Sequence, residues 1–76
     1  MEKVYSFNMN VNGAELVYSV LFDQEVYHFV PEDVHINAPS FQFKLENNHW
    51  KELQQTDPQI KQQAISCLDQ YLLSQH

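Results

Sequence analysis

An Asn-Gly pair that interrupts an alternating apolar pattern constrains the fold of this chain most. From Tyr5 to Asn12, apolar and polar side chains alternate, which is the period of a half-buried strand. Asn12-Gly13 then supplies the two residues of positive φ that a type I′ hairpin turn needs. With these two as the loop, strands at about 3–11 and 14–22 place apolar residues opposite apolar residues. The predicted pairs are Val11 with Ala14, Met9 with Leu16, Phe7 with Tyr18 and Tyr5 with Val20.

The alternation continues after a second possible turn at Asp23-Gln24. This turn predicts a third strand at about 25–30, in which Tyr27 lies opposite Val20 and Phe29 opposite Tyr18. Both new aromatic side chains then share the face that the first hairpin makes apolar.

Residues 31–40 are bracketed by two prolines, which lack the amide hydrogen that a central strand donates. We expect a loop there. A fourth strand is predicted at about 41–46. Asn47-Asn48 leads into a short fifth strand at about 49–53, whose last pairing is irregular because Leu53 does not fit a two-residue turn.

The apolar period becomes helical near the C-terminal end. Apolar residues recur at spacings of three and four from Ile60 onward, which makes one apolar stripe. Thr56 is predicted to cap the helix with Gln59, and Pro58 fits the first turn. The expected helix spans about 57–74. The predicted fold class is therefore α+β, a two-layer domain with an antiparallel meander-type sheet of four to five strands and one C-terminal helix packed on one face.

Length and charge limit the partners. A chain of 76 residues has room for one domain, and ten acidic against four basic residues give a formal charge of −6. That charge repels a phosphate backbone and an anionic membrane, so we expect neither nucleic acid nor a membrane as a partner. The first twenty residues contain neither the apolar region of a signal peptide nor a membrane span, which predicts a cytoplasmic protein.

The residue types that carry chemistry do not converge in the sequence. Gly13 is the only glycine, so there is no glycine-rich phosphate loop, and Cys67 falls on the apolar stripe of the helix, where a thiol is inert. We expect no enzyme, no bound metal and no cofactor. A weaker hypothesis is a ligand pocket formed by His28, His35 and Trp50 if the 31–40 loop passes over the third strand.

A sheet covered by one helix has a second face that meets water or a partner. The predicted registers place aliphatic side chains and one histidine there, and we interpret them as a candidate interface: Val4, Val17, Leu21, Val26, His28 and Val30. Strand propensity, or cover by the 31–40 loop, is the alternative explanation.

The favoured hypothesis is a non-enzymatic interaction module that binds itself as a homodimer or binds another protein. The alternatives are a small-ligand or metal-binding domain that uses the 31–40 loop, and an acidic inhibitor or immunity-type protein whose carboxylates meet a basic partner. The carboxylates would be Asp23, Glu25, Glu32 and Asp33.

Overall fold

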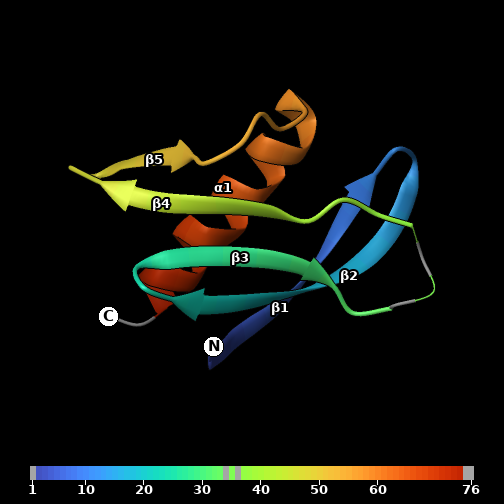
Figure 1. Cartoon of the computed structure of the whole chain (residues 1–76), viewed down its shortest axis with the longest axis horizontal. Helices are drawn as coiled ribbons and strands as arrows, with labels where there is room; N and C mark the ends of the chain where they lie inside the picture. The colour runs from blue at the N-terminus through green and yellow to red at the C-terminus, as the bar shows by residue number, and fades with distance from the viewer. Residues whose placement is uncertain (1, 34, 36, 75–76) are drawn as a thin grey trace.

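Five strands and one helix form two layers in a computed structural model of the chain, which describes residues 2–33, 35 and 37–74 (Figure 1). The strands are β1 (Glu2–Val11), β2 (Ala14–Asp23), β3 (Val26–Pro31), β4 (Phe41–Glu46) and β5 (His49–Glu52), and the helix is α1 (Pro58–Ser74). Each strand pairs antiparallel with the next along the chain, in the order β1-β2-β3-β4-β5. The predicted fold class is confirmed, and of the four to five strands expected, all five form.

The first hairpin has the predicted register. Asn12 and Gly13 form the loop with φ values of 54° and 85°, and Val11 pairs with Ala14. The Asn10 side chain closes the turn, because its Oδ1 accepts the Gly13 N–H at 3.1 Å. The pairing continues as predicted as far as Tyr5 and Val20.

The second turn lies one residue later than predicted, at Gln24 and Glu25. Both residues have positive φ, 51° and 67°, so the turn resembles the first although neither is glycine or asparagine. Asp23 therefore stays in β2, and Val20 pairs with Phe29 instead of Tyr27. The predicted pairing was wrong by two residues, and since side chains alternate with period two, the faces are unchanged.

β1 contains a bulge that the alternation did not predict. Lys3 pairs with Leu21 and Tyr5 pairs with Val20, so Val4 is the extra residue between them. Val4 packs against the core and Lys3 takes its place on the other face. The prediction that Val4 lies on the uncovered face was therefore wrong.

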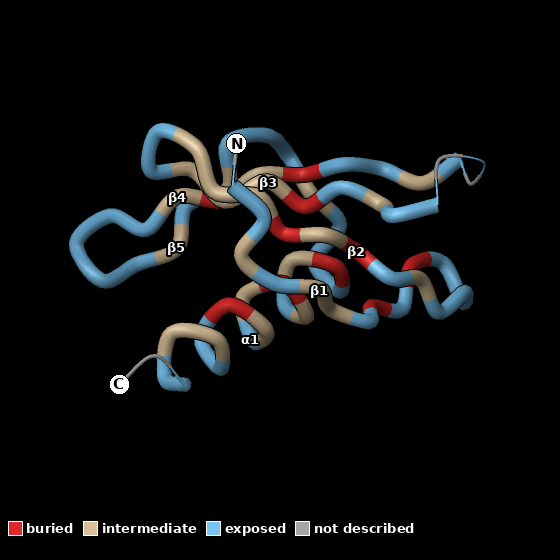
Figure 2. Tube along the Cα trace, turned by 90° about the horizontal axis from the view of Figure 1, so that it is seen from below, coloured by how far each residue is buried: buried red, intermediate tan, exposed pale blue. Residues whose placement is uncertain are grey.

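The core lies between the sheet and α1, and the buried segments in Figure 2 are found on both layers. Aromatic rings from three strands meet there, with ring centroids of Phe41 5.1 Å from Phe29 and 5.2 Å from Tyr18. The buried residues are Met9, Val11, Tyr18, Val20, Phe29, Phe41, Phe43, Ile60, Ala64 and Leu68. Edge-to-face and offset packing of such rings adds to the stabilisation that their burial contributes.

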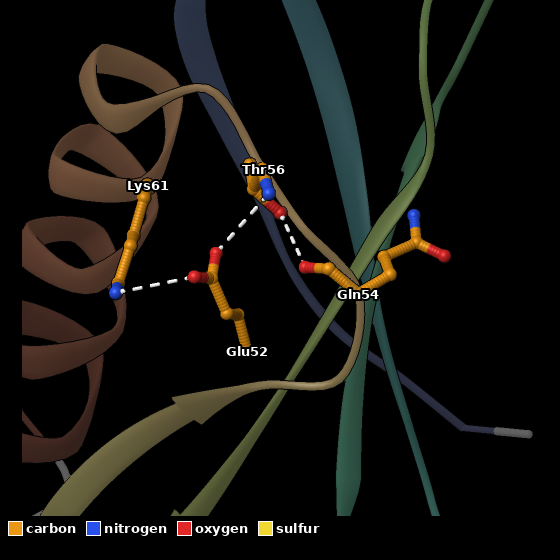
Figure 3. A network of polar contacts seen from close by, with 4 residues as sticks. All are labelled: Glu52, Gln54, Thr56 and Lys61. Atoms are coloured by element: carbon orange, nitrogen blue, oxygen red, sulfur yellow. Dashed lines mark hydrogen bonds and ion pairs between the residues drawn. The ribbon is translucent and has the colours of Figure 1, made fainter.

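A short polar network joins β5 to the helix (Figure 3). Glu52 accepts the Thr56 N–H at 3.2 Å through one carboxylate oxygen, and the other lies 3.4 Å from the Lys61 Nζ. The Thr56 hydroxyl donates to the Gln54 carbonyl at 3.1 Å. β5 ends at Glu52 although the Leu53 N–H still donates to β4, so the predicted strand end was one residue too long.

Asp57, and not Thr56, caps the helix. Its Oδ1 accepts the Gln59 N–H at 2.9 Å, and its carbonyl accepts the Lys61 N–H at 2.8 Å. The helix begins at Pro58, one residue later than predicted. The Thr56 hydroxyl is held instead by the connecting segment, which is why it does not reach the helix.

Replacing the cap should therefore weaken the fold measurably. We expect Asp57→Ala to lower the free energy of unfolding by about 1 kcal/mol, since the Gln59 N–H loses its acceptor. Thr56→Ala, the matched control, should cost less than half as much because its hydroxyl bond is exposed. Urea unfolding followed by circular dichroism measures both. A larger effect at Thr56 would contradict this assignment of the cap.

Candidate interaction surface

One face of the sheet is covered by the helix, and no described segment packs over the other, which we call the open face. It consists of cross-strand rows of residues: Asn10 and Glu15; Asn8, Val17 and Glu32; Ser6, Ser19 and Val30; Lys3, Leu21, His28 and Gln42; Asp23, Val26, Lys44 and Lys51; and Glu46 and His49. These residues alternate along each strand with buried ones such as Val20, Phe29 and Phe43. In Figure 1 the helix passes behind β3 and β4, so this view looks onto the open face.

The described part of the 31–40 loop turns toward the helix side. Ala38 packs against the core, and the Pro39 carbonyl accepts the hydroxyl of buried Tyr18 at 2.8 Å. Val34 and Ile36 lie outside the described residues. The loop therefore closes the end of the core, and its described residues leave the aliphatic side chains of the open face accessible.

The open face brings together five of the six predicted interface residues. Val17 is 45% exposed and Val30 is 36% exposed, on neighbouring strands. Leu21, Val26 and His28 are half-buried by their neighbours in the sheet. These side chains form an aliphatic strip across β2 and β3, and Val17 and Val30 are its solvent-exposed members.

Lysines are the feature of this face that sequence reasoning missed. Lys3, Lys44 and Lys51 are three of the four basic residues, and all three share the open face. Lys3 reaches across β2 to within 3.9 Å of Glu32, and Lys44 lies 3.7 Å from Glu46. The alternation of β4 and β5 placed Lys44 and Lys51 on this face already, whereas the position of Lys3 depends on the bulge.

Charge is consequently divided unevenly over the molecule. The open face carries three lysines and four carboxylates, so its formal charge is −1. The chain has a formal charge of −6, so the rest of the surface carries −5. The carboxylates are Glu15, Asp23, Glu32 and Glu46. The open face is thus close to neutral in an acidic molecule.

The predicted ligand pocket is not formed. His28 belongs to the open face, whereas Trp50 packs against the core on the helix side, 5.6 Å from Tyr27 between ring centroids. The indole Nε1 donates to the Asp69 carboxylate of α1 at 2.8 Å, so Trp50 ties β5 to the helix. His35 is exposed in the loop. Among the described residues, no three His, Cys, Asp or Glu side chains gather as metal ligands.

The carboxylates proposed for a basic partner form two separate groups. Asp23 and Glu25 lie at the β2–β3 turn, and Glu32 and Asp33 follow the other end of β3. The six residues of β3 separate the groups by roughly 20 Å of strand. They therefore do not act as one acidic patch.

Burial weakens the acidity of the one thiol and of two phenols. It raises the pKa of Cys67 above its usual range, and it does the same for Tyr18. The pKa of Tyr27 is raised by burial first and by the neighbouring Tyr71 second. Each group is held in its neutral form at pH 7, which is the opposite of what a cysteine nucleophile requires.

Comparison with known proteins adds no assignment to this geometry: no protein-family model, curated protein sequence or solved structure matches the chain. Within the described ranges, no helix combines the length and apolarity needed to cross a membrane.

The raised pKa of Cys67 predicts slow alkylation. The folded state holds the proton more tightly, so the thiol contributes stability that is fully present below its unfolded pKa and is lost as the pH rises through the folded value. Iodoacetamide should therefore react more slowly with the native chain than with the urea-unfolded chain at pH 8. The alkylation rate of the native chain should also begin to rise at a higher pH than that of the unfolded chain. A native rate equal to or above the unfolded one would identify an activated cysteine instead.

Proposed function

We propose that this domain is a non-enzymatic interaction module that pairs with a second copy of itself through the open face. The observation that carries the proposal is the combination of an uncovered aliphatic strip with the near-neutral charge of that face. Elsewhere the surface is acidic, so two copies repel each other in most orientations.

The apolar gain comes from side chains that the fold leaves in water. Val17 and Val30 are the exposed members of the strip, and Leu21 and Val26 are accessible in part. Complete burial of one such side chain contributes roughly 1.5–3 kcal/mol, and a partly exposed one contributes less. Cys67 is the only cysteine, so the chain forms no internal disulfide. A small core of this kind is stabilised when further apolar area is buried in a dimer.

Charge and size agree with face-to-face pairing. Lysines and carboxylates are mixed on the open face, so a twofold arrangement can bring Lys44 or Lys51 of one copy near Glu46 or Asp23 of the other. The molecule measures 34 × 24 × 21 Å, and its broad side has the order of size of a standard interface, about 800 Å² per partner.

Light scattering coupled to size exclusion, over a hundredfold range of concentration, tests this assignment. We expect the wild-type mass to rise toward that of a dimer, and Val30→Asp to return it to the monomer because a carboxylate is then buried against the second copy. Leu73→Asp is the matched control, since Leu73 is 74% exposed on α1 and the added charge is the same. A monomeric wild type at the highest concentration would overturn the proposal.

Ionic strength tests whether the aliphatic strip or the charges carry the self-association. Two copies of charge −6 repel each other, and salt screens that repulsion. The dimer should therefore tighten by a few fold between 0.01 and 0.15 M salt, as measured by sedimentation equilibrium. Weakening over the same range would show that lysine–carboxylate pairs across the interface outweigh the repulsion between the two net charges, contrary to an interface carried by the aliphatic strip.

A further inference from the structure

A glutamine of the helix pairs with the outer edge of the sheet as a strand would. The Asn10 N–H donates to the Gln63 Oε1 at 2.8 Å, and the Gln63 Nε2 donates to the Asn10 carbonyl at 2.8 Å. One side-chain amide thus occupies both backbone groups of one edge residue. The edge of β1 therefore accepts an amide in this position, which is the chemistry of a peptide bond.

The same edge continues beyond Asn10. In an antiparallel ladder, the N–H and C=O of one residue point to the same neighbour, and those of the next residue point away. Because the backbone groups of Asn10 point outward, those of Asn8 and Ser6 do as well, as far as the bulge at Val4. Among the described residues, no hydrogen bond to these outward groups of Asn8 and Ser6 is found.

A shallow trough lies between β1 and the flank of α1; its lining includes Asn10 of this edge, whereas Ser6 and Asn8 lie beside it. One hollow of about 680 Å³ and another of about 280 Å³ share Gln70, so they follow each other along the helix. The residues of the first are Asn10, Gln59, Gln62, Gln63, Ser66, Cys67 and Gln70, and those of the second are Tyr5, Phe7, Gln70, Tyr71 and Ser74. In Figure 2 the β1 and α1 traces lie next to each other.

The lining determines which side chains the trough accepts. All of its lining residues are uncharged, in a chain that carries fourteen charged ones. A charged side chain placed there would lose hydration without gaining an opposite charge. At the far end, Tyr5 is 53% exposed and its ring centroid lies 5.9 Å from that of Tyr71. That end is suited to an apolar or aromatic side chain.

We propose that the trough between β1 and α1 binds an extended, uncharged peptide segment of a partner protein, which adds to the sheet as a sixth strand beside β1. The segment pairs with the outward backbone groups of Ser6 and Asn8, which offer up to four hydrogen bonds over about 7 Å of strand. An apolar residue of the segment packs on Tyr5 and Tyr71. The side chains of Ser6 and Asn8 lie on the open face, but the proposed contact uses their outward backbone groups and the helix side of the sheet, so either proposal can hold without the other.

A random heptapeptide library displayed on phage is the probe. Selection on the wild-type domain should enrich uncharged peptides, which are then synthesised and measured by fluorescence anisotropy. Asn8→Pro removes one outward N–H and leaves the ladder to β2 intact, since proline is tolerated on edge strands. We expect it to weaken binding about tenfold, whereas Asn8→Ala, which keeps the N–H, should bind as the wild type does.

A second pair of variants covers the case in which Asn8→Pro does not fold. Ser66→Arg places a long cation in the trough from an exposed position and should abolish binding. Leu73→Arg adds the same charge to α1 outside the trough and should leave binding unchanged. Absence of enriched peptides, or peptides that bind Ser66→Arg as tightly as wild type, would overturn the proposal. The proposal would also be overturned if the protein dimerised and Asn8→Pro disrupted the dimer while Asn8→Ala did not. In that case the edge of β1 would pair with a second copy of the chain.

Discussion

A single helix can cover only one face of a five-stranded sheet, and the arrangement of this molecule follows from that constraint. α1 buries Ile60, Ala64 and Leu68 against the rings of the inner face, and the connection through Glu52 and Asp57 sets its position at the end of β5. Trp50 adds a bond from β5 to Asp69, in the C-terminal half of the helix. All of these contacts between the layers lie on the helix side of the sheet. The open face is therefore kept compatible with water only by the side chains that it carries.

The open face and the edge of β1 are managed by different means. Lysines and carboxylates border the aliphatic strip on the open face, which keeps it hydrated without giving it a strong field of either sign. The edge of β1 carries no charge between Lys3 and Glu15, although charged side chains are a common protection of edge strands. A bulge at Val4 and the amide of Gln63 limit that edge at its two ends, and a short stretch remains between them.

The sequence predicted the faces of the strands correctly except at the N-terminal end of β1, and it predicted some of their pairings wrongly. Asn12-Gly13 specifies its turn because asparagine and glycine tolerate positive φ, so the first register could be predicted. Gln24 and Glu25 adopt the same conformation without that signature, and the register that they set pairs Phe22 with Tyr27, 4.7 Å between ring centroids. The bulge at Val4 has no local signal either. It transferred one predicted interface residue to the core side and brought Lys3 to the open face.

The trough was beyond prediction from sequence for a related reason. Its two walls come from segments more than fifty residues apart, and the bond that joins them, from Gln63 to Asn10, depends on the angle at which the helix crosses the sheet. Gln63 lies off the apolar stripe that begins at Ile60, on the side of the helix where helical periodicity expects polar residues, so the sequence gives it no special role. The position of α1 alongside the outer strand makes that side chain a substitute for a neighbouring strand. Pairing through the open face would leave both troughs of a dimer accessible. A partner with two suitable segments would then bind more tightly than one with a single segment, because the first contact raises the effective concentration of the second segment at its trough.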